Sequence, residues 1–143
     1  MKISTKGRYA IRVMIDLAEH NTGEYITLMD IANRQGISEK YLESIVSILS
    51  KNGLLLSLRG KGGGYKLAKA PGEYKVGTIL HLTEGALEPV PCLDDEMNAC
   101  HRADNCPTRK MWKGLTELIN DYFDGITVAD LVENEPYIDN YVI

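Results

Sequence analysis

The chain has 143 residues, of which 44% are hydrophobic and 25% are charged, a composition typical of a small globular protein. No apolar run reaches the ~18–20 residues of a membrane-spanning helix. The basic start is followed by a stretch that contains charged residues, so it does not have the pattern of a secretory signal. We therefore expect a cytoplasmic protein with no membrane partner. The net charge of −4 divides unevenly, at +5 for residues 1–69 and −9 for residues 70–143, so only the first half is expected to meet a polyanion.

Three helices are predicted in the first half of the chain. The first follows Ser4 or Thr5, either of which can cap it, and ends at Asn21-Thr22-Gly23. The second follows Thr27 and ends at a turn over residues 35–37. The third follows Ser38, ends at Asn52-Gly53, and has an apolar side formed by Tyr41, Leu42, Ile45, Ile48 and Leu49. A helix, a glycine-containing turn and a capped helix in this order are typical of a helix-turn-helix unit.

A β-hairpin is predicted directly after the third helix. Residues 54–58 and 65–68 have the composition of strands, and between them lies Arg59-Gly60-Lys61-Gly62-Gly63-Gly64. Glycines let the protein backbone lie close to the sugar-phosphate backbone of DNA, and the two cations suit phosphates or a narrow minor groove. The pattern therefore favours a DNA-binding wing over a plain tight hairpin. The glycines do not complete a P-loop or a dinucleotide-binding fingerprint.

The second half of the chain predicts an accessory helical region. A short helix over 76–82 ends near Gly85, residues 88–106 are irregular, and Pro107 suits the first turn of a long helix. That long helix has a broad apolar face, which needs a partner, and a second copy of the chain is the simplest one. The residues of this face are Met111, Trp112, Leu115, Leu118, Ile119, Tyr122 and Phe123. Thr127 caps a last helix over 128–132. We therefore divide the chain into a winged helix-turn-helix domain (1–70), a connecting helix with a cysteine-bearing loop (71–106), a dimerisation region (107–134) and a tail (135–143).

Three cysteines lie within 15 residues of one another, with the spacing Cys92-x7-Cys100-x5-Cys106. Soft thiolates on one loop can hold a metal centre, and iron–sulfur clusters tolerate such irregular spacing. His101 is a possible fourth ligand; His81 and the carboxylates Asp94, Asp95, Glu96 and Asp104 are others. A redox-active disulfide and three inert thiols are the alternatives.

Several segments together carry a resemblance to a known family. These are Met1 to Ala10, Ile31-Ala32, Gln35 to Ser38, Tyr41-Leu42-Glu43, Lys51 to Leu54 and Arg59 to Tyr65. They closely resemble the IscR-like winged-helix transcription regulators of the Rrf2 family, whose branches include IscR, NsrR, RirA and CymR. The resemblance runs from Met1 to about Glu133.

The resemblance implies a homodimer that binds double-stranded DNA at a palindromic operator. The helix after Ser38 is expected in the major groove and the wing at the minor groove. The implied DNA-binding residues are Ser4, Lys6, Arg8, Ser38, Lys40, Tyr41, Glu43, Ser44, Arg59, Gly60 and Lys61. Cluster-binding branches carry three cysteines where Cys92, Cys100 and Cys106 stand, so the resemblance also implies a [2Fe-2S] or [4Fe-4S] cluster.

The chain departs from the family pattern at the fourth ligand. IscR has a histidine three residues after its last cysteine, where this chain has Arg109, and NsrR-type regulators have an early aspartate, where it has Arg8. The wide first gap between cysteines is closer to the RirA branch, and the CymR branch lacks the three cysteines. The leading interpretation is a DNA-binding transcription regulator controlled by an iron–sulfur cluster at the three cysteines. A second interpretation keeps the DNA-binding dimer and gives control to a partner protein or to thiol oxidation. A third, an enzyme with a cysteine nucleophile, lacks an oriented base near Cys100, and we expect no enzyme.

Overall fold

The computed structural model describes residues 1–93, 102 and 104–133. It has six α-helices and one antiparallel pair of strands in the described residues, which confirms the predicted mainly helical fold with a small β-wing. Two short 3-10 turns lie between these elements, Pro71–Glu73 before the fourth α-helix and Pro91–Leu93 after it. Cys100, His101, Asp94, Asp95, Glu96 and the tail 135–143 lie outside the described residues.

The helix-turn-helix consists of α2 (Leu28–Gln35) and α3 (Glu39–Lys51), preceded by α1 (Thr5–Glu19). Each of the three begins after a predicted hydroxyl cap. The oxygens of Ser4, Thr27 and Ser38 accept hydrogen bonds from backbone N–H groups three residues later, at 3.1–3.2 Å. The turn between α2 and α3 begins with Gly36 in the left-handed conformation (φ +65°), and the buried Ile37 follows. These local signals explain why the helix starts were predictable.

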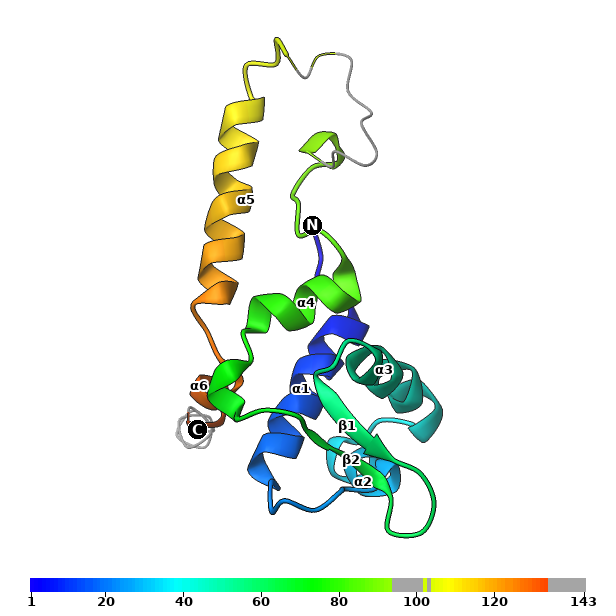
Figure 1. Cartoon of the computed structure of the whole chain (residues 1–143). Helices are drawn as coiled ribbons and strands as arrows, with labels where there is room; N and C mark the ends of the chain where they lie inside the picture. Colours follow the sequence, from blue (N-terminus) through cyan, green and yellow to red (C-terminus); the bar gives the residue numbers. More distant parts are fainter. Residues whose placement is uncertain (94–101, 103, 134–143) are drawn as a thin grey trace, which may run out of the picture.

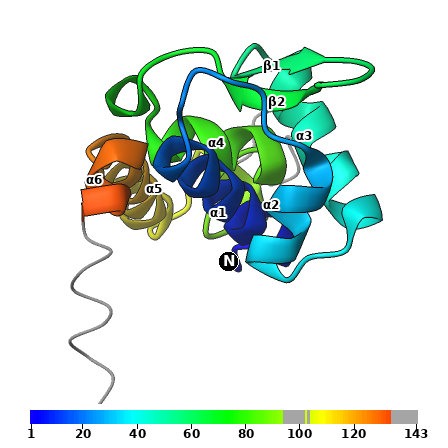
Figure 2. The same cartoon turned by 90° about the horizontal axis from the view of Figure 1, so that it is seen from below.

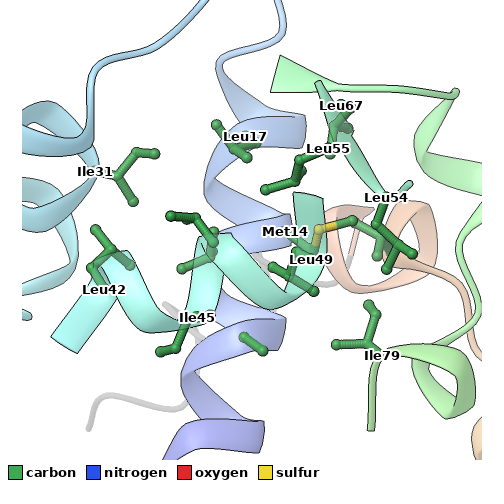
Figure 3. Close-up of a cluster of buried hydrophobic side chains, with 14 of the residues drawn as sticks. Met14, Leu17, Ile31, Leu42, Ile45, Leu49, Leu54, Leu55, Leu67 and Ile79 are labelled. Atoms are coloured by element: carbon green, nitrogen blue, oxygen red, sulfur yellow. The ribbon is translucent and has the colours of Figure 1, made fainter. Parts of the chain in front are cut away.

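The hydrophobic core lies between α1, α2, α3 and the hairpin, as Figure 3 shows. Met14 and Leu17 of α1 face Ile31 of α2 and the fully buried Leu42, Ile45 and Leu49 of α3. The predicted apolar side of α3 was incomplete: Val46 is fully buried, whereas Ile48 and Tyr41 are only half-buried. Val128 of α6 (Val128–Glu133) is buried in the same cluster, so the last helix packs on the amino-terminal lobe.

The hairpin consists of β1 (Leu55–Leu58) and β2 (Gly64–Leu67), paired so that Leu55 lies opposite Leu67 and Leu58 opposite Gly64. Two further backbone hydrogen bonds of 2.8 Å join Tyr65 to Ile26, in the segment between α1 and α2. The hairpin is therefore attached to the lobe along the edge of β2 that faces away from β1, while its tip projects outward.

The connecting helix α4 (Val76–Glu84) and the long helix α5 (Arg109–Asp124) form the other part of the molecule. Val76, Leu80 and Leu87 form a second buried cluster, against which Ile119 and Phe123 of α5 pack. The prediction that Pro107 lies in the first turn of α5 was wrong, because the helix begins at Arg109. Figures 1 and 2 show α5 and α6 on one side of α1, and α3 with the hairpin on the other. None of the helices in the described part of the chain is long and apolar enough to cross a membrane.

Candidate DNA-binding surface and cysteine segment

The start of α3 presents a polar surface to solvent. Ser38, Lys40, Glu43 and Ser44 are exposed, which suits side chains that reach base edges or phosphates. Tyr41 is half-buried, because its ring packs edge-on against Tyr9 of α1 with 5.8 Å between the ring centroids. The exposed side of α3 is therefore polar, while the buried aliphatic side chains of its other side fix it to the core.

The wing places its cations at an exposed tip. A four-residue turn, Gly60 to Gly63, closes with the N–H of Gly63 donating to the carbonyl of Gly60 at 3.0 Å. Gly60 and Gly62 have positive φ angles of +92° and +78°, which explains why glycine occupies these positions. Arg59, Gly60 and Lys61 are all exposed. The hairpin therefore carries two cations, separated by Gly60, on a turn made mostly of glycine.

A groove of 560 Å³ brings α3 and the wing together. Glu43 of α3 and Arg59 and Gly60 of the wing, all predicted from the sequence, line it. Further polar side chains that the sequence analysis did not identify also line it: Thr27, Ser47, Lys51 and Ser57. They come from three separate segments, the start of α2, α3 and β1, and no local pattern brings them together. Hydroxyls and cations beside glycine backbone are the groups that contact a sugar-phosphate strand.

The three residues predicted at the start of α1 differ in their surroundings. Arg8 is exposed and donates to the Thr5 hydroxyl at 3.0 Å, and Lys6 is half-buried. The Ser4 hydroxyl caps α1 and also donates to the carboxylate of Glu84 in α4, which accepts from the Ser4 backbone N–H at 3.2 Å as well. The Ser4 side chain is therefore engaged within the protein.

The cysteine segment lies between α4 and α5, and two of its thiols are described. Cys92 is in the 3-10 turn Pro91–Leu93, Cys106 precedes α5, and both are half-buried free thiols. The hydroxyl of Thr108 lies 3.3 Å from the Cys106 sulfur. That hydrogen bond, with a smaller contribution from Arg102, lowers the pKa of the Cys106 thiol and so favours the thiolate that ligates metals.

The described residues contain no assembled metal site. No group of three His, Cys, Asp or Glu side chains within residues 1–93, 102 and 104–133 lies close enough to hold a metal ion. His81 sits on α4 with its two ring nitrogens 3.1 Å from the carbonyl of Gly85 and 3.0 Å from the Asn120 side-chain oxygen. It bridges α4 to α5, which disfavours it as a ligand. Arg109, the first residue of α5, borders a 220 Å³ cavity together with Leu93.

Comparison with known proteins decides the family. Residues 3–134 match the profile of the Rrf2 family, described as an iron-dependent transcriptional regulator. The chain is a member of the Rrf2 family. The HTH-type transcriptional regulator IscR of Pectobacterium carotovorum is 40% identical over 139 residues, which cover 97% of this chain and 84% of that protein. IscR of Erwinia tasmaniensis is 41% identical over 135 residues, covering 94% and 81%.

Solved Rrf2 structures have the same fold. CymR, the global cysteine regulator of B. subtilis, superposes with a TM-score of 0.75 at 36% identity, over 93% of this chain and 97% of that one. T. potens IscR superposes with a TM-score of 0.74 at 37% identity, over 94% and 88%. Membership of Rrf2 makes the chain a DNA-binding transcription regulator and not an enzyme, as predicted.

Proposed function

We propose that the chain binds a palindromic DNA operator as a homodimer, with α3 in the major groove and the wing at the minor groove. The observation that carries the proposal is the groove between the polar side of α3 and the glycine wing, lined by Glu43, Lys51 and Arg59. These elements belong to the basic part of the chain, whereas α5 and α6 of the acidic part lie on the other side of α1 (Figure 2). Charge and shape therefore favour one DNA-binding face.

Two wing variants test the DNA-binding face. If Arg59 enters a groove, Arg59→Ala should weaken binding to a duplex selected from a random library by about 1–3 kcal/mol. Lys61→Ala removes a phosphate contact, so the slope of log affinity against log salt should flatten by about one unit. Lys75→Ala, at an exposed lysine just before α4, is the matched control and should bind like the parent. Parental binding by both wing variants would contradict the assignment.

The dimer is supported by an apolar stripe along α5. Met111, Leu115, Leu118 and Tyr122 are 38–68% exposed although their spacing places them on one helical face. Leu118 and Tyr122 also line an apolar hollow of 600 Å³ with Met1. The opposite face of α5 already packs on α4, so the exposed stripe is free to meet its counterpart in a second copy.

Sedimentation of a charged variant tests the dimer. Leu118→Lys places a cation in the stripe and should give a monomer, whereas Asn33→Lys, at an exposed position of α2, should leave the dimer intact. A dimeric Leu118→Lys variant would place the interface elsewhere.

We further propose that Cys92, Cys100 and Cys106 hold an iron–sulfur cluster, with the fourth ligand open. The donor chemistry fits, because Cys92 and Cys106 are free thiols and the Cys106 thiolate is favoured by its surroundings. When bound, a cluster supplies a group whose charge and integrity respond to iron and oxidants. Control by thiol oxidation or by a partner protein, without a cluster, is the second candidate, and the same free thiols support it.

Anaerobic analysis separates the two candidates. If a cluster controls binding, the purified full-length protein should contain iron and acid-labile sulfide, and its duplex affinity should change when the cluster is removed. Its visible absorbance should be abolished by Cys92→Ala, Cys100→Ala or Cys106→Ala. Protein without iron whose duplex affinity changes on thiol oxidation would favour the second. Identical affinity with and without the cluster would refute control by the cluster.

A further inference from the structure

An arginine outside the predicted DNA-binding set is attached to the turn of the helix-turn-helix. Arg12 lies on α1, and its guanidinium reaches Gln35, the last residue of α2. Its Nε donates to the Gln35 side-chain oxygen at 3.0 Å, and its Nη2 donates to the Gln35 backbone carbonyl at 2.5 Å. One planar side chain thus binds both the main chain and the side chain at the start of the turn.

The side chain of Gln35 is also held by Asp16. Its amide nitrogen donates to the carboxylate of Asp16 at 2.9 Å, and Asp16 is only 1% exposed. Arg34 donates to both oxygens of that carboxylate at 2.8 and 3.0 Å. The hydrogen bond to Asp16 raises the already high pKa of Arg34, so this guanidinium is charged at every physiological pH. Gln35 is therefore fixed between the buried carboxylate of Asp16 and the exposed Arg12.

Arg12 is also connected to α3. Its guanidinium carbon lies 5.0 Å from the centre of the Tyr9 ring, over its face. The Tyr9 ring packs edge-on against Tyr41 of α3. Arg12 therefore touches the residue that ends α2 and, through Tyr9, the first turn of α3.

We propose that Arg12 is a positioning residue that sets the orientation of α3 on α1 and so contributes to DNA sequence specificity without contacting DNA. Two of its five N–H donors are bonded to Gln35, and its face lies over the ring of Tyr9. Lysine keeps the charge but cannot make two planar hydrogen bonds to one residue and stack at the same time. Base-edge contacts depend on helix orientation, whereas phosphate contacts tolerate small shifts, so loss of Arg12 should affect specific binding selectively.

The test compares Arg12→Lys with Arg12→Ala in the full-length protein. The probes are a duplex selected from a random library by the parent and an unrelated duplex of equal length, each titrated across a potassium chloride series. We expect both variants to bind the selected duplex about tenfold more weakly, with unchanged affinity for the unrelated duplex and an unchanged salt slope. An Arg12→Lys variant that binds like the parent, or a salt slope that falls by about one in Arg12→Ala, would instead make Arg12 a direct phosphate contact and overturn the proposal.

A double-mutant cycle with Gln35→Ala checks the route of the effect. Because Arg12 acts through Gln35, the Arg12→Lys and Gln35→Ala double variant should lose little more selected-duplex affinity than the weaker-binding single variant. Fully additive losses would overturn the proposal. The inference rests on the proposed DNA binding; a parent protein that selects no duplex would remove that proposed function, whereas a selective parent with unaffected variants would remove only the role of Arg12.

Discussion

Gly64, the first residue of β2, offers a quantitative test of how the wing is attached. Its φ is +150°, and a Cβ at this position would lie 2.1 Å from the backbone carbonyl oxygen of Ile26 and 2.5 Å from its carbonyl carbon. Neither atom belongs to a side chain that can turn away. Gly64→Ala therefore has to separate β2 from Ile26, and with it the two 2.8 Å hydrogen bonds between Ile26 and Tyr65.

The expected loss can be worked out from these parts. Two backbone hydrogen bonds contribute about 1 kcal/mol each, and an unfavourable φ costs an alanine about 1 kcal/mol. Gly64→Ala should therefore lower the free energy of unfolding by about 3 kcal/mol. Gly62 is the matched control, because its φ of +78° is also positive but no atom lies within 4 Å of its ideal Cβ. Gly62→Ala should cost only about 1 kcal/mol.

Urea unfolding of the full-length variants, followed by circular dichroism, measures both losses. Protein concentration is kept constant, because the stability of a dimer depends on it. If Gly64→Ala and Gly62→Ala are equally stable, the contact between β2 and Ile26 does not hold the wing.

Two further predictions concern the core and the cysteine segment. Leu49→Ala, at a fully buried position, should lower the free energy of unfolding by about 2–5 kcal/mol. Leu56→Ala, at a position 45% exposed, should lower it by less than about 1 kcal/mol. Equal losses of unfolding free energy in urea titrations would contradict the described core. Thr108→Val removes the hydroxyl beside the Cys106 sulfur and should raise the pKa of that thiol, so its rate of alkylation by iodoacetamide should rise at higher pH than in the parent. That rate is measured with the other two cysteines replaced by serine, and an unchanged pH profile would refute the role of the hydroxyl.

The helix starts and the hairpin were predictable because their signals are local. A serine or threonine three residues before a backbone N–H caps α1, α2 and α3 wherever the rest of the chain lies. The start of α5 was misplaced by two residues, since a proline that tolerates a first turn does not require one. Val46 was missed because a single apolar stripe was assigned to α3, although this helix contacts the hairpin and α1 as well as α2.

The parts of the site that escaped prediction depend on contacts between distant segments. Thr27 and Ser57 join Lys51 in one groove only after the hairpin folds back on α3. Arg12 and Gln35 are 23 residues apart, and nothing in either segment indicates the bond between them. The resemblance to Rrf2 implied a set of DNA-binding residues that does not include Arg12. It does include Ser4, whose hydroxyl donates to the carboxylate of Glu84.

Sedimentation of a fluorescently labelled selected duplex with the full-length protein, at increasing salt, tests the central claim most directly. We predict a complex of two protein copies per duplex that dissociates steeply as salt rises, because a symmetric pair of basic lobes neutralises phosphates on both half-sites. A monomeric protein that leaves the duplex unbound at every salt concentration would contradict the account.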